Sequence, residues 1–154
     1  MARYAATVKV VAGITGVAAS IQEYDPYYSG NNGTGTNMTV MLLKRNPTQW
    51  GQLGWMKSKI DNGTIQRQVG IEYYISSSDN RFYFWPGKTI GTYTPYKIYY
   101  QAPIWRFYAY TTELTAQALI PAPTEYQMFG ETHDLADQMP GGINGHALFK
   151  FAKY

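Results

Sequence analysis

Short strand-like runs separated by turn-forming residues constrain the fold of this 154-residue chain most strongly. Within Gln66–Ile75, Val69 and Ile71 fall on one side of an extended backbone, and Gln68 and Glu72 fall on the other. Because side chains alternate between the two faces of a strand, this pattern predicts a strand with one apolar face. Runs of this kind recur along the chain, as in antiparallel sandwiches and barrels.

Turn signals show where consecutive strands are joined. Asp61-Asn62-Gly63 stands between two strand-like runs and predicts a hairpin, because Asn-Gly tolerates the positive φ angles of tight turns. Ala102-Pro103 divides another pair of runs in the same way, and residues 25–36 predict a long exposed loop. The other predicted strands are Arg3–Val11, Gly16–Tyr24 (as its hairpin partner), Met38–Lys44, Gln49–Lys57, Arg81–Trp85, Tyr93–Gln101, Ile104–Tyr110, Thr115–Leu119, Tyr126–His133 and Ala147–Tyr154.

Helical patterns are almost missing from the sequence. Glu113–Leu119 and Asp134–Met139 could each form a helical turn, but neither has an apolar stripe. The sequence therefore predicts an all-β fold with two antiparallel sheets, a β-sandwich of the jelly-roll or concanavalin-like kind. With no internal repeat or linker, residues 1–154 are expected to form a single domain.

Charge and composition limit the classes of partner. The net charge is +3, and Lys44-Arg45 is the densest basic pair, so we expect no nucleic-acid partner. No apolar run is long enough for a membrane span, and zero cysteines exclude a disulfide framework and a thiolate metal site. The start of the sequence lacks the apolar core of a signal peptide, and we interpret it as an extracellular mature domain carrying an added methionine.

The histidines offer a metal site that we do not favour. His133 is followed by Asp134 and Asp137, a pattern that could bind a divalent ion together with His146. The two aspartates are better explained as polar caps of a loop. We expect no metal and no cofactor.

Aromatic residues crowd the predicted hairpin at 93–110. If its rings face solvent, they could stack against sugars, whereas ordinary cross-strand pairing would use the same rings to stabilise the sheet. Both interpretations stay open. The candidate binding surface comprises Tyr96, Tyr99, Tyr100, Trp105 and Tyr108.

Two polar side chains stand among apolar and small residues in predicted strands. Gln52 shares a strand face with Trp50 and Gly54, and Glu131 shares one with Phe129. A neighbouring glycine would leave open space where a substrate backbone could approach. The carboxylate could serve as general base and acid, and the amide could stabilise an oxyanion.

The segments around these residues resemble the glutamic peptidases, which include the fungal eqolisins and the neprosin-like proteins. The matching motifs are Gln52-Leu53-Gly54-Trp55, Ile71-Glu72-Tyr73-Tyr74 and Phe129-Gly130-Glu131-Thr132. The resemblance implies a seven-stranded sheet whose concave face forms a groove. It also implies that Glu131 activates water, that Gln52 orients it, and that Glu72, Trp50, Tyr74 and His133 support the site. Plant neprosins carry glutamate where this chain has Gln52.

Three functions follow as hypotheses. The first is a secreted glutamic-peptidase-like hydrolase that cleaves peptide or polypeptide substrates at acidic pH. The second is a non-catalytic module that binds glycans or peptides through the same face. The third is an extracellular fibre or surface subunit that uses residues 25–37 in lattice contacts. The sequence leaves the oligomeric state undetermined.

Overall fold

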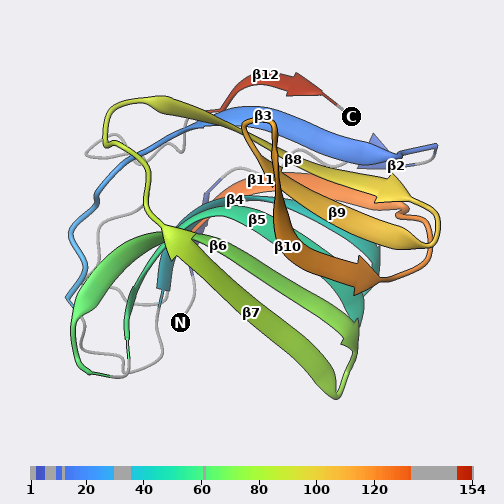
Figure 1. The fold of residues 1–154 in the computed structure, drawn as a ribbon, viewed down its shortest axis with the longest axis horizontal. Helices are drawn as coiled ribbons and strands as arrows, with labels where there is room; N and C mark the ends of the chain where they lie inside the picture. The colour runs from blue at the N-terminus through green and yellow to red at the C-terminus, as the bar shows by residue number, and fades with distance from the viewer. Residues whose placement is uncertain are drawn as a thin grey trace.

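The fold is all-β, as predicted. The computed structural model describes residues 3–5, 10–11, 13–29, 36–60, 62–132 and 149–153, and side chains at 13–29, 37–60, 62–114, 118–132 and 149–150. Every secondary-structure element in these ranges is a strand, and the strands form two antiparallel sheets (Figure 1). Consequently, none of the described residues lies in a helix that could cross a membrane.

The larger sheet has seven strands in the order β1-β11-β4-β5-β6-β7, with β2 also paired to β11. The expected turn at Asn62-Gly63 joins β5 to β6, and Gly63 has a φ of 84°. In Figure 1 the sheet arches beneath the smaller one, with β7 at its free edge. Its strands are β1 (Arg3–Ala5), β2 (Val10–Val11), β4 (Thr36–Asn46), β5 (Gln49–Lys59), β6 (Ile65–Ser76), β7 (Asp79–Pro86) and β11 (Glu125–Thr132).

The smaller sheet has five strands in the order β10-β9-β8-β3-β12. Ala102-Pro103 joins β8 to β9, as expected, and the segment that could have formed a helical turn, Glu113–Leu119, lies in β10. The five strands are β3 (Gly16–Gln22), β8 (Tyr93–Gln101), β9 (Ile104–Ala109), β10 (Thr112–Leu119) and β12 (Phe149–Lys153).

The predicted hairpin between the first two strand-like runs is wrong. β1 and β2 pair with β11 in the larger sheet, whereas β3 pairs with β8 and β12 in the smaller one. Alternation of side chains shows that a segment is extended, but it carries no information about which partner supplies the inter-strand hydrogen bonds. The two neighbouring segments therefore belong to opposite layers.

The core lies between the two sheets. Leu53, Trp55 and Ile71 fill it from the larger sheet, and Ile98 and Phe107 fill it from the smaller one. On β5 and β6 these residues alternate with Gln52 and Glu72, which therefore point away from the smaller sheet. We call this second side of the seven-stranded sheet the outer face.

A buried polar cluster fixes one edge of the core. Glu23 is 0% exposed, forms an ion pair with Arg67, and accepts a hydrogen bond of 2.6 Å from the Tyr96 hydroxyl. Arg67 also donates to the backbone oxygen of Lys88, and the Gly91 amide donates to the backbone oxygen of Glu23 at 2.7 Å. The cluster thus ties residues 88–91 to β6 and to the end of β3.

Alkaline pH is expected to destabilise the fold through Tyr96. Burial and the nearby Glu23 carboxylate raise the pKa of Tyr96 above its ordinary value of 10.0. Above about pH 10 the unfolded chain would release this proton while the folded chain keeps it, so the free energy of unfolding falls as pH rises. Urea unfolding between pH 8 and 11 should show that the free energy of unfolding falls less steeply with pH in Tyr96→Phe than in the wild type. The same pH dependence in Tyr96→Phe and the wild type would contradict this prediction. Tyr27→Phe is the control, because Tyr27 is 63% exposed and its removal should leave the pH dependence unchanged.

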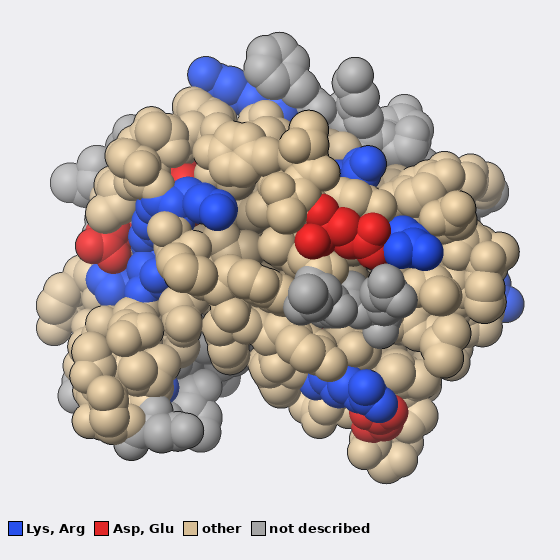
Figure 2. All heavy atoms as spheres, viewed as in Figure 1, with Lys and Arg blue, Asp and Glu red and all other residues tan. Residues whose placement is uncertain are grey.

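Charged side chains are scattered over the visible surface. Figure 2 shows acidic and basic residues in small mixed groups separated by uncharged surface. The lower margin in this view is notched between two lobes.

Candidate functional site

Strand register places one row of side chains across five strands of the outer face. The Cα partners run from β11 through β4, β5 and β6 to β7, so the row crosses the sheet perpendicular to the strands. Adjacent strands lie about 4.8 Å apart, and the row therefore extends over roughly 19 Å. Its members are Gln127, Leu42, Gln52, Glu72 and Phe82.

Most of this row lines a pocket of about 340 Å³, which we call the outer-face pocket. Four neighbouring strands, β11, β4, β5 and β6, supply its walls. Apolar side chains on β4 and β11 belong to a hydrophobic cluster of their own on this face. The lining residues are Met38, Leu42, Trp50, Gln52, Glu72, Gln127, Phe129 and Glu131.

The centre of the outer-face pocket is an amide–carboxylate pair. Gln52 is 3% exposed, and its Nε2 donates a hydrogen bond of 2.7 Å to Glu72 Oε2. The same nitrogen donates to Met38 Sδ at 3.6 Å. Both amide hydrogens of Gln52 therefore have acceptors, while its Oε1 has no hydrogen bond within the described residues and can accept one from a ligand.

An aromatic wall stands beside this pair. Trp50 and Tyr74 are direct neighbours on β5 and β6, and their rings stack with centroids 4.6 Å apart and planes inclined by 26°. Both rings are half-buried. The site thus presents a π-surface next to hydrogen-bonding groups.

Glu131 lies in the same pocket but in another row. It is 8% exposed, and its direct neighbour on β4 is Met38. On β11 the row of Gln52 is occupied by Gln127, four residues before Glu131. The pocket therefore brings together one polar residue from each quoted motif, Gln52, Glu72 and Glu131. The direct hydrogen-bond partner of Gln52 is Glu72. Gln127 was not among the predicted site residues, although it stands two residues before Phe129 and four before Glu131 on one strand and therefore shares their face.

Open space above glycine, expected from the sequence, is not found at Gly54. A Cβ at this position would lie 2.0 Å from the Thr39 backbone oxygen and 2.8 Å from Val40 Cα. The glycine accommodates close contact with the backbone of β4, so it leaves no gap for a substrate. This interpretation of Gly54 was wrong.

The histidines cannot be placed in the site. His133, His146, Asp134 and Asp137 lie outside the described residues. Within the ranges that are described, no three His, Asp or Glu side chains gather in a metal-binding arrangement.

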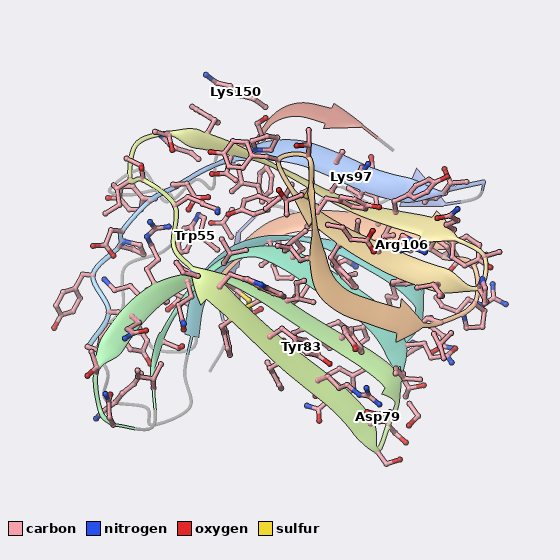
Figure 3. All side chains as sticks on the ribbon, viewed as in Figure 1. Trp55, Asp79, Tyr83, Lys97, Arg106 and Lys150 are labelled. Atoms are coloured by element: carbon pink, nitrogen blue, oxygen red, sulfur yellow. The ribbon has the colours of Figure 1, made fainter. Side chains whose placement is uncertain are left out.

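The predicted aromatic surface is divided by strand alternation. Tyr96 and Trp105 are buried in the core, so for these two candidates the binding-surface interpretation was wrong and the packing interpretation holds. Tyr100 is half-buried against the core. Tyr99 is 40% exposed, and Tyr108 lies on the same side of the hairpin. The ammonium of Lys97, labelled in Figure 3, lies 5.7 Å and 4.3 Å from the ring centroids of Tyr99 and Tyr108. These two rings belong to the five-stranded sheet, away from the outer-face pocket.

Comparisons with known proteins inform the fold. No protein-family model matches the chain, and no curated protein matches its sequence. A tetrameric galectin from the ball sponge Cinachyrella sp. is similar in structure, with a TM-score of 0.56, 12% identity, and coverage of 96% of this chain and 98% of the galectin. A β-glucanase of Bacillus licheniformis has a TM-score of 0.54 and 13% identity over 84% of this chain and 59% of the enzyme.

A family 16 glycoside hydrolase, an endo-glucanase from Bacteroides ovatus, gives a TM-score of 0.51 and 13% identity over 82% of this chain. The chain spans 60% of the length of that enzyme. At these identities the similarity shows the jelly-roll, concanavalin-like fold.

These neighbours correct the peptidase prediction. They are glucanases and a galectin, and the structural similarity does not lead to a peptidase. The peptidase prediction was based on short motifs in which a polar residue stands between apolar ones on a strand. This pattern occurs in many kinds of binding site, so it does not distinguish a peptidase from other proteins. The peptidase function was therefore wrong by this comparison, while the roles predicted for Gln52, Glu72 and Glu131 within the site stay predictions.

Proposed function

We propose that the protein binds carbohydrate in the outer-face pocket. The observation that carries this proposal is the Trp50–Tyr74 stack beside the Gln52–Glu72 pair. A sugar ring has a C–H face that packs on an aromatic surface and hydroxyl groups that donate to amide and carboxylate oxygens. The fold shared with glucanases and a galectin supports the same function.

The charge of the pocket favours an uncharged glycan. Glu72 and Glu131 line it, and among the lining residues that the structure describes none is Lys or Arg. An anionic sugar would bring like charges together in a partly buried site, which raises the free energy of binding. Neutral hydroxyl groups can instead donate to the carboxylates and to Gln52 Oε1.

The test is calorimetric binding of neutral oligosaccharides, including mixed-linkage glucan tetrasaccharides, cello-oligosaccharides and lactose. Trp50→Ala removes the stacking surface and is expected to weaken binding about tenfold, since an aromatic contact contributes roughly 1 kcal/mol beyond its buried area. Tyr99→Ala, on the five-stranded sheet, is the matched control and should bind like the wild type. Equal loss in both variants, or no binding to any of these glycans, would overturn the proposal.

A second candidate function, glycoside hydrolysis, is favoured by one observation: two carboxyl groups, Glu72 and Glu131, line the same pocket. Most glycosidases use one carboxyl group to protonate the leaving oxygen while the other activates water or attacks the anomeric carbon. Incubation of the bound oligosaccharide would then release new reducing ends, and Glu131→Gln would abolish their release. Binding without release identifies a binding module.

Extracellular location and the fibre-subunit function stay predictions, and residues 30–35 of the proposed lattice loop lie outside the described ranges.

A further inference from the structure

A second pocket lies between the free edges of the two sheets, at the side of the sandwich where β7 ends one sheet and β10 ends the other. We call it the side pocket. Its volume is about 400 Å³, and it shares none of its lining residues with the outer-face pocket.

Apolar groups form the interior of the side pocket. Val69, Ala109 and Leu114 are buried residues of the main core and line it. Trp85 supplies an aromatic wall and is held by stacking on Tyr83, which Figure 3 labels on β7, with centroids 6.3 Å apart. A pocket of this size with mostly apolar lining suits the body of a small organic molecule.

Lys88 is the cation at the side pocket, and no described acidic side chain pairs with it. Lys88 Nζ lies 5.8 Å from the centroid of the Tyr110 ring, which is 52% exposed. Within the part of the chain that the structure describes, Lys88 forms no ion pair. Its backbone oxygen accepts a hydrogen bond from Arg67, and this contact fixes the position from which the side chain extends.

The carboxylate that also lines the pocket is already neutralised. Glu113 pairs with Arg106 at 2.6 Å and accepts a hydrogen bond of 3.2 Å from the Tyr108 hydroxyl. Among the described lining residues, the charge left for a ligand is therefore that of Lys88, which attracts an anionic group.

From this combination of apolar interior and free cation, we propose that the side pocket binds a small anionic amphiphile. The ligand class is an aromatic or aliphatic body carrying one carboxylate or sulfonate, with the body against Val69 and Trp85 and the anionic group at Lys88. The side pocket is separate from the outer-face pocket, so this binding does not depend on carbohydrate binding.

Fluorescence titration with 8-anilino-1-naphthalenesulfonate tests the proposal directly. Wild-type protein is expected to bind this probe saturably at one site. Lys88→Glu should weaken its binding at least about tenfold, because attraction at the pocket becomes repulsion. The neutral dye N-phenyl-1-naphthylamine has a similar apolar body but no anionic group. Its affinity for Lys88→Glu should therefore differ from its affinity for the wild type by less than about threefold. Lys97→Glu, on the outer surface of the five-stranded sheet, is the matched control and should bind both probes as the wild type does.

The position of the bound probe provides a second readout. In nitrogen–proton correlation spectra, the sulfonate probe is expected to change the chemical shifts of the backbone amides of Val69, Ala109 and Leu114. The amide resonances of Gln52 and Gln127 should not change. Three outcomes would overturn the proposal: no saturable binding, unchanged affinity in Lys88→Glu, or shifts at Gln52 and Gln127 instead.

Discussion

Arg67→Met is expected to lower the free energy of unfolding by about 3–5 kcal/mol, because it leaves a buried carboxylate without its cation. Glu23 has no exposed surface, and the Arg67 side chain is 10% exposed. The ion pair is therefore shielded from water, and the hydrogen bond from Tyr96 alone does not compensate the charge of Glu23. Loss of the contact from Arg67 to the Lys88 backbone oxygen adds to the effect.

Urea unfolding at neutral pH measures this effect, and two further variants separate its causes. Arg81→Met removes an exposed arginine paired with Asp79 and should leave the unfolding midpoint almost unchanged. The double variant Arg67→Met/Glu23→Gln removes the uncompensated charge, so it should be more stable than Arg67→Met alone. If Arg67→Met unfolds at the same midpoint as Arg81→Met, the buried pair does not have the stabilising role described here.

Gly54→Ala is expected to destabilise the larger sheet by about 3 kcal/mol or more, at the upper end of overpacking costs. The added Cβ would lie 2.0 Å from the Thr39 backbone oxygen and 2.8 Å from Val40 Cα. Because both atoms belong to the backbone of β4, the strands must separate to admit the methyl group. The hydrogen bonds between β4 and β5 would weaken as a result.

Gly70 is the matched control, since it faces Gly54 directly across β5 and β6. A Cβ at Gly70 would meet Met56 Sδ at 2.4 Å, which is the flexible part of a side chain. Met56 can rotate away, so Gly70→Ala should change the free energy of unfolding by no more than about 1 kcal/mol. Chemical unfolding of both variants checks the difference. Equal effects of the two substitutions would contradict the backbone contact as the cause.

Local pattern predicted which segments are strands. The alternation at Gln66–Ile75 and the Asn62-Gly63 turn are properties of neighbouring residues, and β6 and its hairpin with β5 form as expected. The same alternation placed Gln52 beside Trp50, and the structure keeps both in one pocket. Such predictions succeed because extended backbone and turn conformations depend mainly on residues close in sequence.

Pairing between distant strands could not be predicted in this way. The row that joins Gln127 to Gln52 depends on the register of β11 against β4 and of β4 against β5. A shift of one residue in either pairing would have moved these side chains to opposite faces of the sheet. The motifs contained the residues of the site, but only the register showed that Glu72 is the hydrogen-bond partner of Gln52.

The sequence by itself thus determined the all-β class, the positions of most strands and the candidate polar residues, because periodicity of two and turn chemistry are local. Tertiary structure decided the rest. It sent β1 and β3 to different sheets, buried Tyr96 and Trp105 while leaving Tyr99 exposed, and opened the side pocket between β7 and β10. Each of these depends on which face of a strand meets the other sheet, and that choice is made by packing the whole core rather than by any one segment.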